Sequence, residues 1–134
     1  ASMQNKTVVG LETFEQQMNF FDQIFERNPD ISHDDLILDT LNELKNHSDL
    51  PAKMLNAWLD ADIKVFEEIY KKTLSDSAFD IAAEKVLLTD RNQRWGQKLT
   101  TILDKHKTLV AVGSLHFSGQ QALQTLLTGF EQVR

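Results

Sequence analysis

The sequence predicts a mostly helical α/β protein, in which a small sheet of two to three strands carries a four- to five-helix insertion between its first two strands. Three observations support this prediction. Residues 6–11 and 107–113 are β-branched apolar runs closed by glycine, as in strands buried on both faces. Nearly all of the chain between them has helical periodicity. Its 134 residues suit a single domain or a piece of one.

The first predicted strand, residues 6–11, is followed by a helix over residues 13–27. Apolar side chains recur there every three or four positions, and an Asn-Pro-Asp break follows. A second helix begins at Ser32, with Asp35 three residues later as a weak capping box, and fades at residues 46–48.

A third helical stretch begins after Ser48 or Asp49 and continues to Tyr70, with a break expected at residues 60–62. Pro51 lies in its first turn, where a missing N–H costs little. The next periodic segment covers residues 78–105, and Gly96 is its weakest point.

The second strand, residues 107–113, is followed by a short helix over residues 120–128 that ends at Gly129, and residues 130–134 are a third strand candidate. About ninety residues separate the first two strands, which is too long for a simple crossover. We therefore expect the helices to cover an edge of the sheet.

Composition excludes several classes of protein. The chain has no cysteine, so disulfide scaffolds, thiolate metal clusters and cysteine nucleophiles are excluded. A net charge of −6 gives no basic footprint for nucleic acid. No apolar run approaches the ~20 residues of a membrane span. The residues after Ala1 lack the basic segment and following apolar stretch of a signal peptide, so none is expected in this chain.

Two chemically useful side chains follow the predicted strands. Glu12 comes after Gly10, and His116 comes after Gly113, so we expect both at the same edge of the sheet. They could be a metal-ligand pair, or a base with its partner. The alternatives are that Glu12 caps the following helix and that His116 is a hydrogen-bonded turn residue.

Arg91 lies in a polar break, Thr-Asp-Arg-Asn at residues 89–92, beside Trp95. It could orient a ligand or pair with Glu12 or Asp90, or it could belong to a solvated helical turn. The other histidines have no metal-ligand spacing and are expected at the surface: His33, His47 and His106. Ser114 lacks the Gly-x-Ser-x-Gly context of a serine hydrolase, and no phosphate-binding glycine loop is present.

Three segments together resemble the TraB/GumN family. Residues 10–17 read Gly-Leu-Glu-Thr-Phe-Glu-Gln-Gln, similar to the family's "GLET-x-x-EQ". Residues 89–92 with Trp95 are similar to its "ERN-x-x-W", with Asp90 in place of Glu. Residues 109–116 read Leu-Val-Ala-Val-Gly-Ser-Leu-His, and Gly119 and a leucine-rich stretch ending at Gly129-Phe130 follow. They are similar to the C-terminal pattern of the family, "VAVGAGHL-x-G … LL-x-x-GY-x-V".

The resemblance implies a relative of the Tiki metalloproteases and of exported bacterial GumN-like proteins, and therefore a periplasmic or extracellular location. In that family two Gly-x-x-His motifs and a Glu form the proposed metal-dependent hydrolytic centre. Glu12 matches the Glu, His116 matches the second Gly-x-x-His motif, and Arg91 matches the family's arginine. No first motif precedes Glu12, so the chain is expected to be the C-terminal portion of the domain.

Two functions follow from this comparison of residues. One is a metal-dependent, peptidase-like hydrolase acting on a peptide or protein. Glu12 and Arg91 would be catalytic, and Glu12 and His116 would bind a divalent metal (Mn, Co or Zn) in an incomplete site. The other is a non-catalytic binding or interaction module. The apolar strands and the stripe of Phe14, Phe21 and Phe25 also predict a homo-oligomer, with a symmetric homodimer as the expected form.

Overall fold

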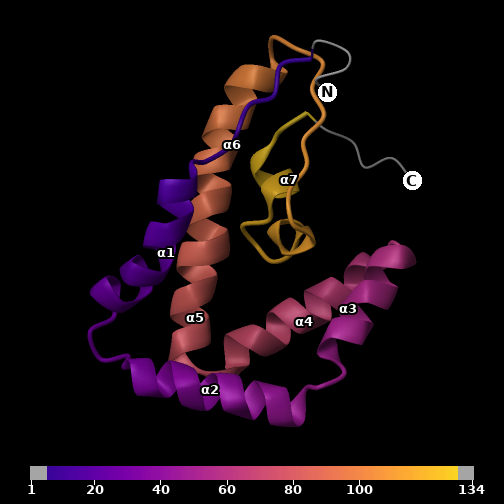
Figure 1. Ribbon diagram of the computed structural model, residues 1–134. Helices are drawn as coiled ribbons and strands as arrows, with labels where there is room; N and C mark the ends of the chain where they lie inside the picture. The colour runs from indigo at the N-terminus through magenta and orange to yellow at the C-terminus, as the bar shows by residue number, and fades with distance from the viewer. Residues whose placement is uncertain (1–5, 130–134) are drawn as a thin grey trace.

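The computed structural model describes residues 6–129, in which helices are joined by short turns and irregular segments (Figure 1). A long rod runs through the molecule, with one helix beside it and a short helical region on its other side. The elements are α1 (Phe14–Arg27), α2 (His33–Asn46), α3 (Leu50–Leu59), α4 (Ile63–Asp76), α5 (Ala78–Glu84), the π-helix η2 (Lys85–Thr89), α6 (Asp90–Leu103), the 3-10 helix η3 (Ser114–Phe117) and α7 (Leu123–Leu126).

The predicted sheet is wrong, because residues 6–129 contain no strand. The two apolar runs, 6–11 and 107–113, are irregular segments beside α6, and the first of them crosses over α6 to reach α1 (Figure 1). Leu11 and Val110 pack against the buried side chains of Trp95, Leu99 and Leu123, whereas Leu109 is 93% exposed. An apolar β-branched run favours extended backbone, but a strand also needs a neighbour to pair with, which these segments lack. The third strand candidate, residues 130–134, lies outside the described residues.

The predicted helices are present, with corrected ends. Ser32 and Asp35 form the predicted capping box of α2, since the backbone N–H of each donates to the other's side chain. The expected break at residues 60–62 separates α3 from α4, and Ala61 there has a φ of 53°. The last helix, α7, is much shorter than the predicted residues 120–128.

The rod consists of α5, η2 and α6 in one continuous run. Gly96 does not weaken it. It lies buried on α6, where an added Cβ would come within 3.3 Å of the Leu126 Cβ, so glycine allows α7 to approach closely. The irregularity is instead the π-helix, residues 85–89, directly before the polar Asp90-Arg91-Asn92 segment. Such π turns are rare in proteins as a whole, and many of those that occur lie at functional sites.

Two hydrophobic clusters flank the rod on different faces. One joins α1 to α5 and η2 through Phe20, Ile24 and Val86. The other joins α6 to α7 and to the irregular segments through Trp95, Leu99 and Leu123. The face of the rod that is buried therefore changes between its two halves, and the change falls near the π-helix.

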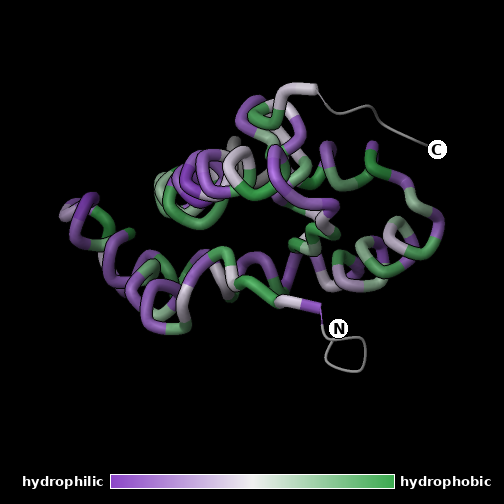
Figure 2. Tube along the Cα trace, turned by 90° about the horizontal axis from the view of Figure 1, so that it is seen from above, coloured by the Kyte–Doolittle hydropathy of each residue, from purple (hydrophilic) through white to green (hydrophobic). Residues whose placement is uncertain are grey.

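Many large apolar side chains remain exposed. In the view from above, hydrophobic residues occur in the helices at the periphery of the molecule as well as near its centre (Figure 2). Phe14 is 75% exposed and Phe21 53%, whereas Phe25 is half-buried and stacks on His33. Of the helices between residues 6 and 129, none combines the length and apolar character that crossing a membrane requires.

We expect the purified chain to form a homodimer, because α1 presents Phe14 and Phe21 to solvent and a second copy would cover them. Light scattering measures the molar mass of the purified chain directly. We would use tens of micromolar protein, roughly the concentration at which weak dimers form. Phe14→Ser and Phe21→Ser should shift the population toward monomer, while Phe117→Ser, in η3, should not. A monomeric wild-type chain at these concentrations would contradict the expectation.

Candidate functional site

Glu12 and Arg91 form an ion pair between the segment before α1 and the first turn of α6. The Arg91 Nε donates to Glu12 Oε2 at 3.1 Å, and its Nη2 donates to Glu12 Oε1. Gln17 Nε2 also donates to Glu12 Oε1, at 2.9 Å. The Glu12 side chain is 8% exposed and that of Arg91 17%, so the pair is largely removed from water. The predicted pairing of Arg91 with Glu12 is confirmed.

Arg91 also joins the two hydrophobic clusters. Its guanidinium carbon lies 5.0 Å from the centre of the Phe20 ring and 4.7 Å from the centre of the Trp95 ring. Both distances suit cation–π contacts. Its Nη1 donates to the carbonyl of Leu87, within the π-helix. The guanidinium is thus fixed by a carboxylate, a carbonyl and two aromatic rings, which excludes the solvated-turn alternative.

His116 contacts Trp95 as well, and so lies close to the ion pair of Glu12 and Arg91. The spacing Gly-x-x-His forms one 3-10 turn, in which the His116 N–H donates to the Gly113 carbonyl at 3.1 Å. The imidazole is buried, and its ring centre lies 4.4 Å from that of Trp95. Glu12 and His116 therefore lie near one another around Arg91 and Trp95, although residues 6–129 contain no sheet whose edge could bring them together.

Asn92 holds His116 from α6. Its Oδ1 lies 2.7 Å from His116 Nδ1, and its Nδ2 donates to the His116 and Gln121 carbonyls at 3.1 and 2.8 Å. Sequence reasoning placed Asn92 in the polar break but gave it no role. The available signal was its spacing of three residues before Trp95, which places both side chains on one face of a helix.

Two buried polar atoms beside this cluster have no hydrogen-bond partner among the described residues: Trp95 Nε1 and Ser118 Oγ. Native proteins leave few such atoms, and each needs an explanation. Both belong to residues next to His116, either in ring contact or two positions along the chain. Together they add two potential hydrogen-bond donors to the polar groups of the cluster.

Burial, with a contribution from the positive charge of Arg91, lowers the pKa of His116 to about 4, and the charge of Glu12 acts in the opposite sense. The imidazole is therefore neutral at pH 7. Because the pKa is lower in the folded chain than in the unfolded chain, the unfolded chain binds the proton more readily, so stability is lost as the pH falls.

We expect the free energy of unfolding to decrease between pH 6.5 and pH 4, which are the ordinary and the folded-state pKa values of His116. Urea unfolding at a series of pH values measures this decrease. His116→Gln should reduce the slope in that window, and His106→Gln, at an exposed position, should not. Equal slopes for wild type and His116→Gln would contradict the low pKa.

Glu12 is not the cap of α1, which corrects the alternative derived from sequence. Thr13 is the N-cap: its hydroxyl accepts from the Gln16 N–H, and Gln16 Oε1 accepts from the Thr13 N–H. We expect Thr13→Ala to lower the free energy of unfolding by about 1 kcal/mol. Asp49→Ala is the matched control, because Asp49 is an N-cap without a side-chain bond. Equal losses in thermal or urea unfolding would contradict this assignment.

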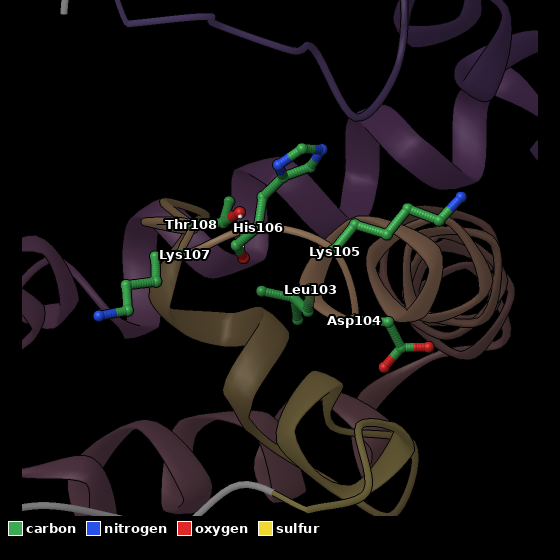
Figure 3. A pocket seen from close by; sticks show the side chains of 6 residues that line it. All are labelled: Leu103, Asp104, Lys105, His106, Lys107 and Thr108. Carbon is green, nitrogen blue, oxygen red and sulfur yellow. Dashed lines mark hydrogen bonds between the residues drawn. The ribbon is translucent and has the colours of Figure 1, made fainter.

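The remaining histidines are not part of the cluster. His33 and His106 are exposed as predicted, whereas His47 is half-buried and contacts Lys72. His106 lines a surface hollow after α6, together with Lys105 and Lys107 (Figure 3). The side chains drawn there point in different directions, so they do not converge on a ligand.

A metal does not fit the cluster as it stands. Among the side chains that the structure describes, those of residues 6–72 and 77–129, no group of three His, Asp or Glu could hold an ion. Both oxygens of Glu12 are already bound by Arg91, and one also by Gln17. A catalytic zinc ion typically has three protein ligands. Of the carboxylate oxygens and imidazole nitrogens of Glu12 and His116, only His116 Nε2 has no hydrogen bond in the described structure.

Comparison with known proteins gives one match. The model of the TraB/PrgY/gumN family matches residues 1–130, nearly the whole chain. No curated protein and no solved structure matches the chain.

Proposed function

The chain belongs to the TraB/PrgY/gumN family, and on this premise we propose that the cluster of Glu12, Arg91 and His116 is part of a peptidase-like hydrolytic centre. The observation that carries the proposal is the convergence of these side chains from three separate segments around Trp95. A largely buried ion pair costs desolvation energy, and perturbed, buried titratable groups gather at functional sites more than elsewhere.

In this centre the His116 nitrogen opposite Nδ1 takes the proton from a water molecule as the water oxygen bonds to the peptide carbonyl carbon. The positive charge of Arg91 stabilises the negative charge that forms on the carbonyl oxygen. His116 then returns the proton to the departing amine nitrogen as the carbon–nitrogen bond breaks. Glu12 orients Arg91 through two hydrogen bonds.

A divalent metal, Mn, Co or Zn, belongs to the proposal only with ligands beyond the described residues. His116 is the candidate ligand from this chain, and Glu12 becomes one when Arg91 and Gln17 release its oxygens. Such a metal supplies a Lewis acid and an acidified water. By the same resemblance we propose export to the periplasm or the outside of a bacterial cell, which fractionation of cells expressing the whole gene tests.

The test of hydrolysis uses the product of the whole gene, incubated with a peptide library and each divalent metal in turn, with cleavage followed by mass spectrometry. We expect cleavage that is lost in His116→Ala and Glu12→Gln, and a dependence on one of the metals only if residues beyond the described ones complete a metal site. His106→Ala and Glu15→Gln are the matched controls at exposed positions and should keep activity. Cleavage that is equal in His116→Ala and wild type would overturn the assignment of the centre.

The alternative is a non-catalytic binding or interaction module. Two observations favour it: the saturation of Glu12 by Arg91 and Gln17, and the burial of His116, which is 6% exposed. The same library assay separates the two functions. Absence of cleavage with every metal and peptide would support the binding module.

A further inference from the structure

We propose that Asn92 is a positioning residue that fixes His116 in the tautomer protonated at Nδ1 and leaves Nε2 as the ring nitrogen available for chemistry. The importance of Nε2 for catalysis rests on the proposed function. The tautomer itself does not, because it follows from the hydrogen bonds of the cluster.

The orientation of the Asn92 amide is determined by its neighbours. Its nitrogen lies 3.1 Å from the His116 carbonyl oxygen and 2.8 Å from the Gln121 carbonyl oxygen. Both carbonyls can only accept hydrogen bonds, so the atom facing them must be the NH₂ group. A rotated amide would place oxygen against two oxygens. Oδ1 therefore faces His116.

The position of the imidazole proton follows from this orientation. Oδ1 can only accept, and it lies 2.7 Å from His116 Nδ1, so Nδ1 carries the proton. In a neutral imidazole the other nitrogen is then an acceptor with a free lone pair. A second contact limits rotation of the ring, since its centre lies 4.4 Å from that of Trp95. Asn92 and Trp95 are three residues apart on α6, so a single helix face sets both the tautomer and the ring orientation.

Two substitutions separate the acceptor of Asn92 from its donors. Asn92→Asp and Asn92→Leu both remove the N–H groups that bind the two carbonyls. Only Asn92→Leu also removes the acceptor for Nδ1–H. A property that differs between these variants therefore depends on the hydrogen bond to His116 Nδ1. A property that both variants lose depends on the hydrogen bonds from Asn92 to the two carbonyls. Leu99→Ala is a control for loss of stability, because Leu99 is buried on the same helix and its side chain plays no part in the hydrogen bonds of His116.

The measurement is the ¹⁵N spectrum of the imidazole nitrogens in the labelled full chain at about pH 8, well above the ordinary histidine pKa. We expect a protonated-type Nδ1 signal and an unprotonated-type Nε2 signal for His116 in wild type, Asn92→Asp and Leu99→Ala. In Asn92→Leu the two signals should exchange character. An Nε2-protonated His116 in the wild type, or unchanged signals in a folded Asn92→Leu, would overturn the inference.

Activity is the second readout, on the whole-gene product. Asn92→Leu should lower kcat/KM about 10–100-fold, mainly through kcat, as for other residues that orient a working histidine. Asn92→Asp should retain most of kcat. If the wild type cleaves no peptide while its tautomer is as expected, the proposed function fails and the inference about Asn92 stands. If kcat/KM falls equally in both variants, the positioning role fails while hydrolysis stands.

Discussion

Arg91→Ala is expected to lower the free energy of unfolding by about 3–5 kcal/mol, because it leaves the carboxylate of Glu12 buried without its partner. The substitution also removes the guanidinium that contacts Phe20 and Trp95, so both hydrophobic clusters lose a neighbour. Urea unfolding followed by circular dichroism measures the loss. Hydrolysis, where it is detected in the wild type, should be abolished.

Arg94→Ala is the matched control for this prediction. Arg94 lies on the same helix, is exposed, and also places its guanidinium over Phe20, at 5.4 Å. Its removal should cost less than about 1 kcal/mol. The double variant Glu12→Gln with Arg91→Met should recover part of the stability, since no charge is then left unpaired. Equal losses for Arg91→Ala and Arg94→Ala would show that the ion pair contributes little.

Gly119→Ala is expected to destabilise the chain by about 2–5 kcal/mol, for two reasons that add. Gly119 has a φ of +83°, where a residue with a Cβ is strained, and the added Cβ would lie 2.4 Å from the Tyr70 ring. Tyr70 cannot easily move away, because its hydroxyl donates to Glu84 Oε1 at 2.7 Å. Thermal unfolding of the purified variant measures the effect.

Gly129→Ala separates the two causes. Gly129 has a φ of +86°, but a Cβ there would meet no described atom within 4 Å, so only the strain is tested. Its loss should be about 1–2 kcal/mol. Tyr70→Leu combined with Gly119→Ala should recover part of the difference. A loss in Gly119→Ala no larger than that in Gly129→Ala would show that Tyr70 gives way.

The helices could be predicted because their signals are local. The capping box of Ser32 and Asp35 joins residues three positions apart, and the break at residues 60–62 separates two periodic stretches. The sheet could not be predicted correctly, since pairing depends on neighbours that the run of residues itself does not specify. The π-helix could not be predicted for another reason. It differs from an α-helix in its hydrogen bonds, and its residue composition does not distinguish it from an ordinary helix.

The candidate site was predictable in part. A buried arginine needs a carboxylate, and this requirement put Glu12, 79 positions away in the sequence, among the candidate partners of Arg91. The role of Asn92 was not predictable, because it depends on a 3-10 turn that the fold brings against α6. The pairing of opposite charges can be anticipated from residue types, whereas a hydrogen bond to one ring nitrogen requires the coordinates of both groups.

The π-helix makes one part of the rod tolerant of a change in chain length. A π-helix holds about one residue more per turn than an α-helix, because each N–H bonds five residues back instead of four. Deleting one residue from 85–89 would therefore restore ordinary α-helical bonding with little rotation of α6 relative to α5. A deletion elsewhere in α5 or α6 would instead rotate the two parts of the rod by about 100° and turn Val86 or Asn92 away from the interior. We therefore expect a one-residue deletion to be tolerated better at residues 85–89 than in the helices on either side.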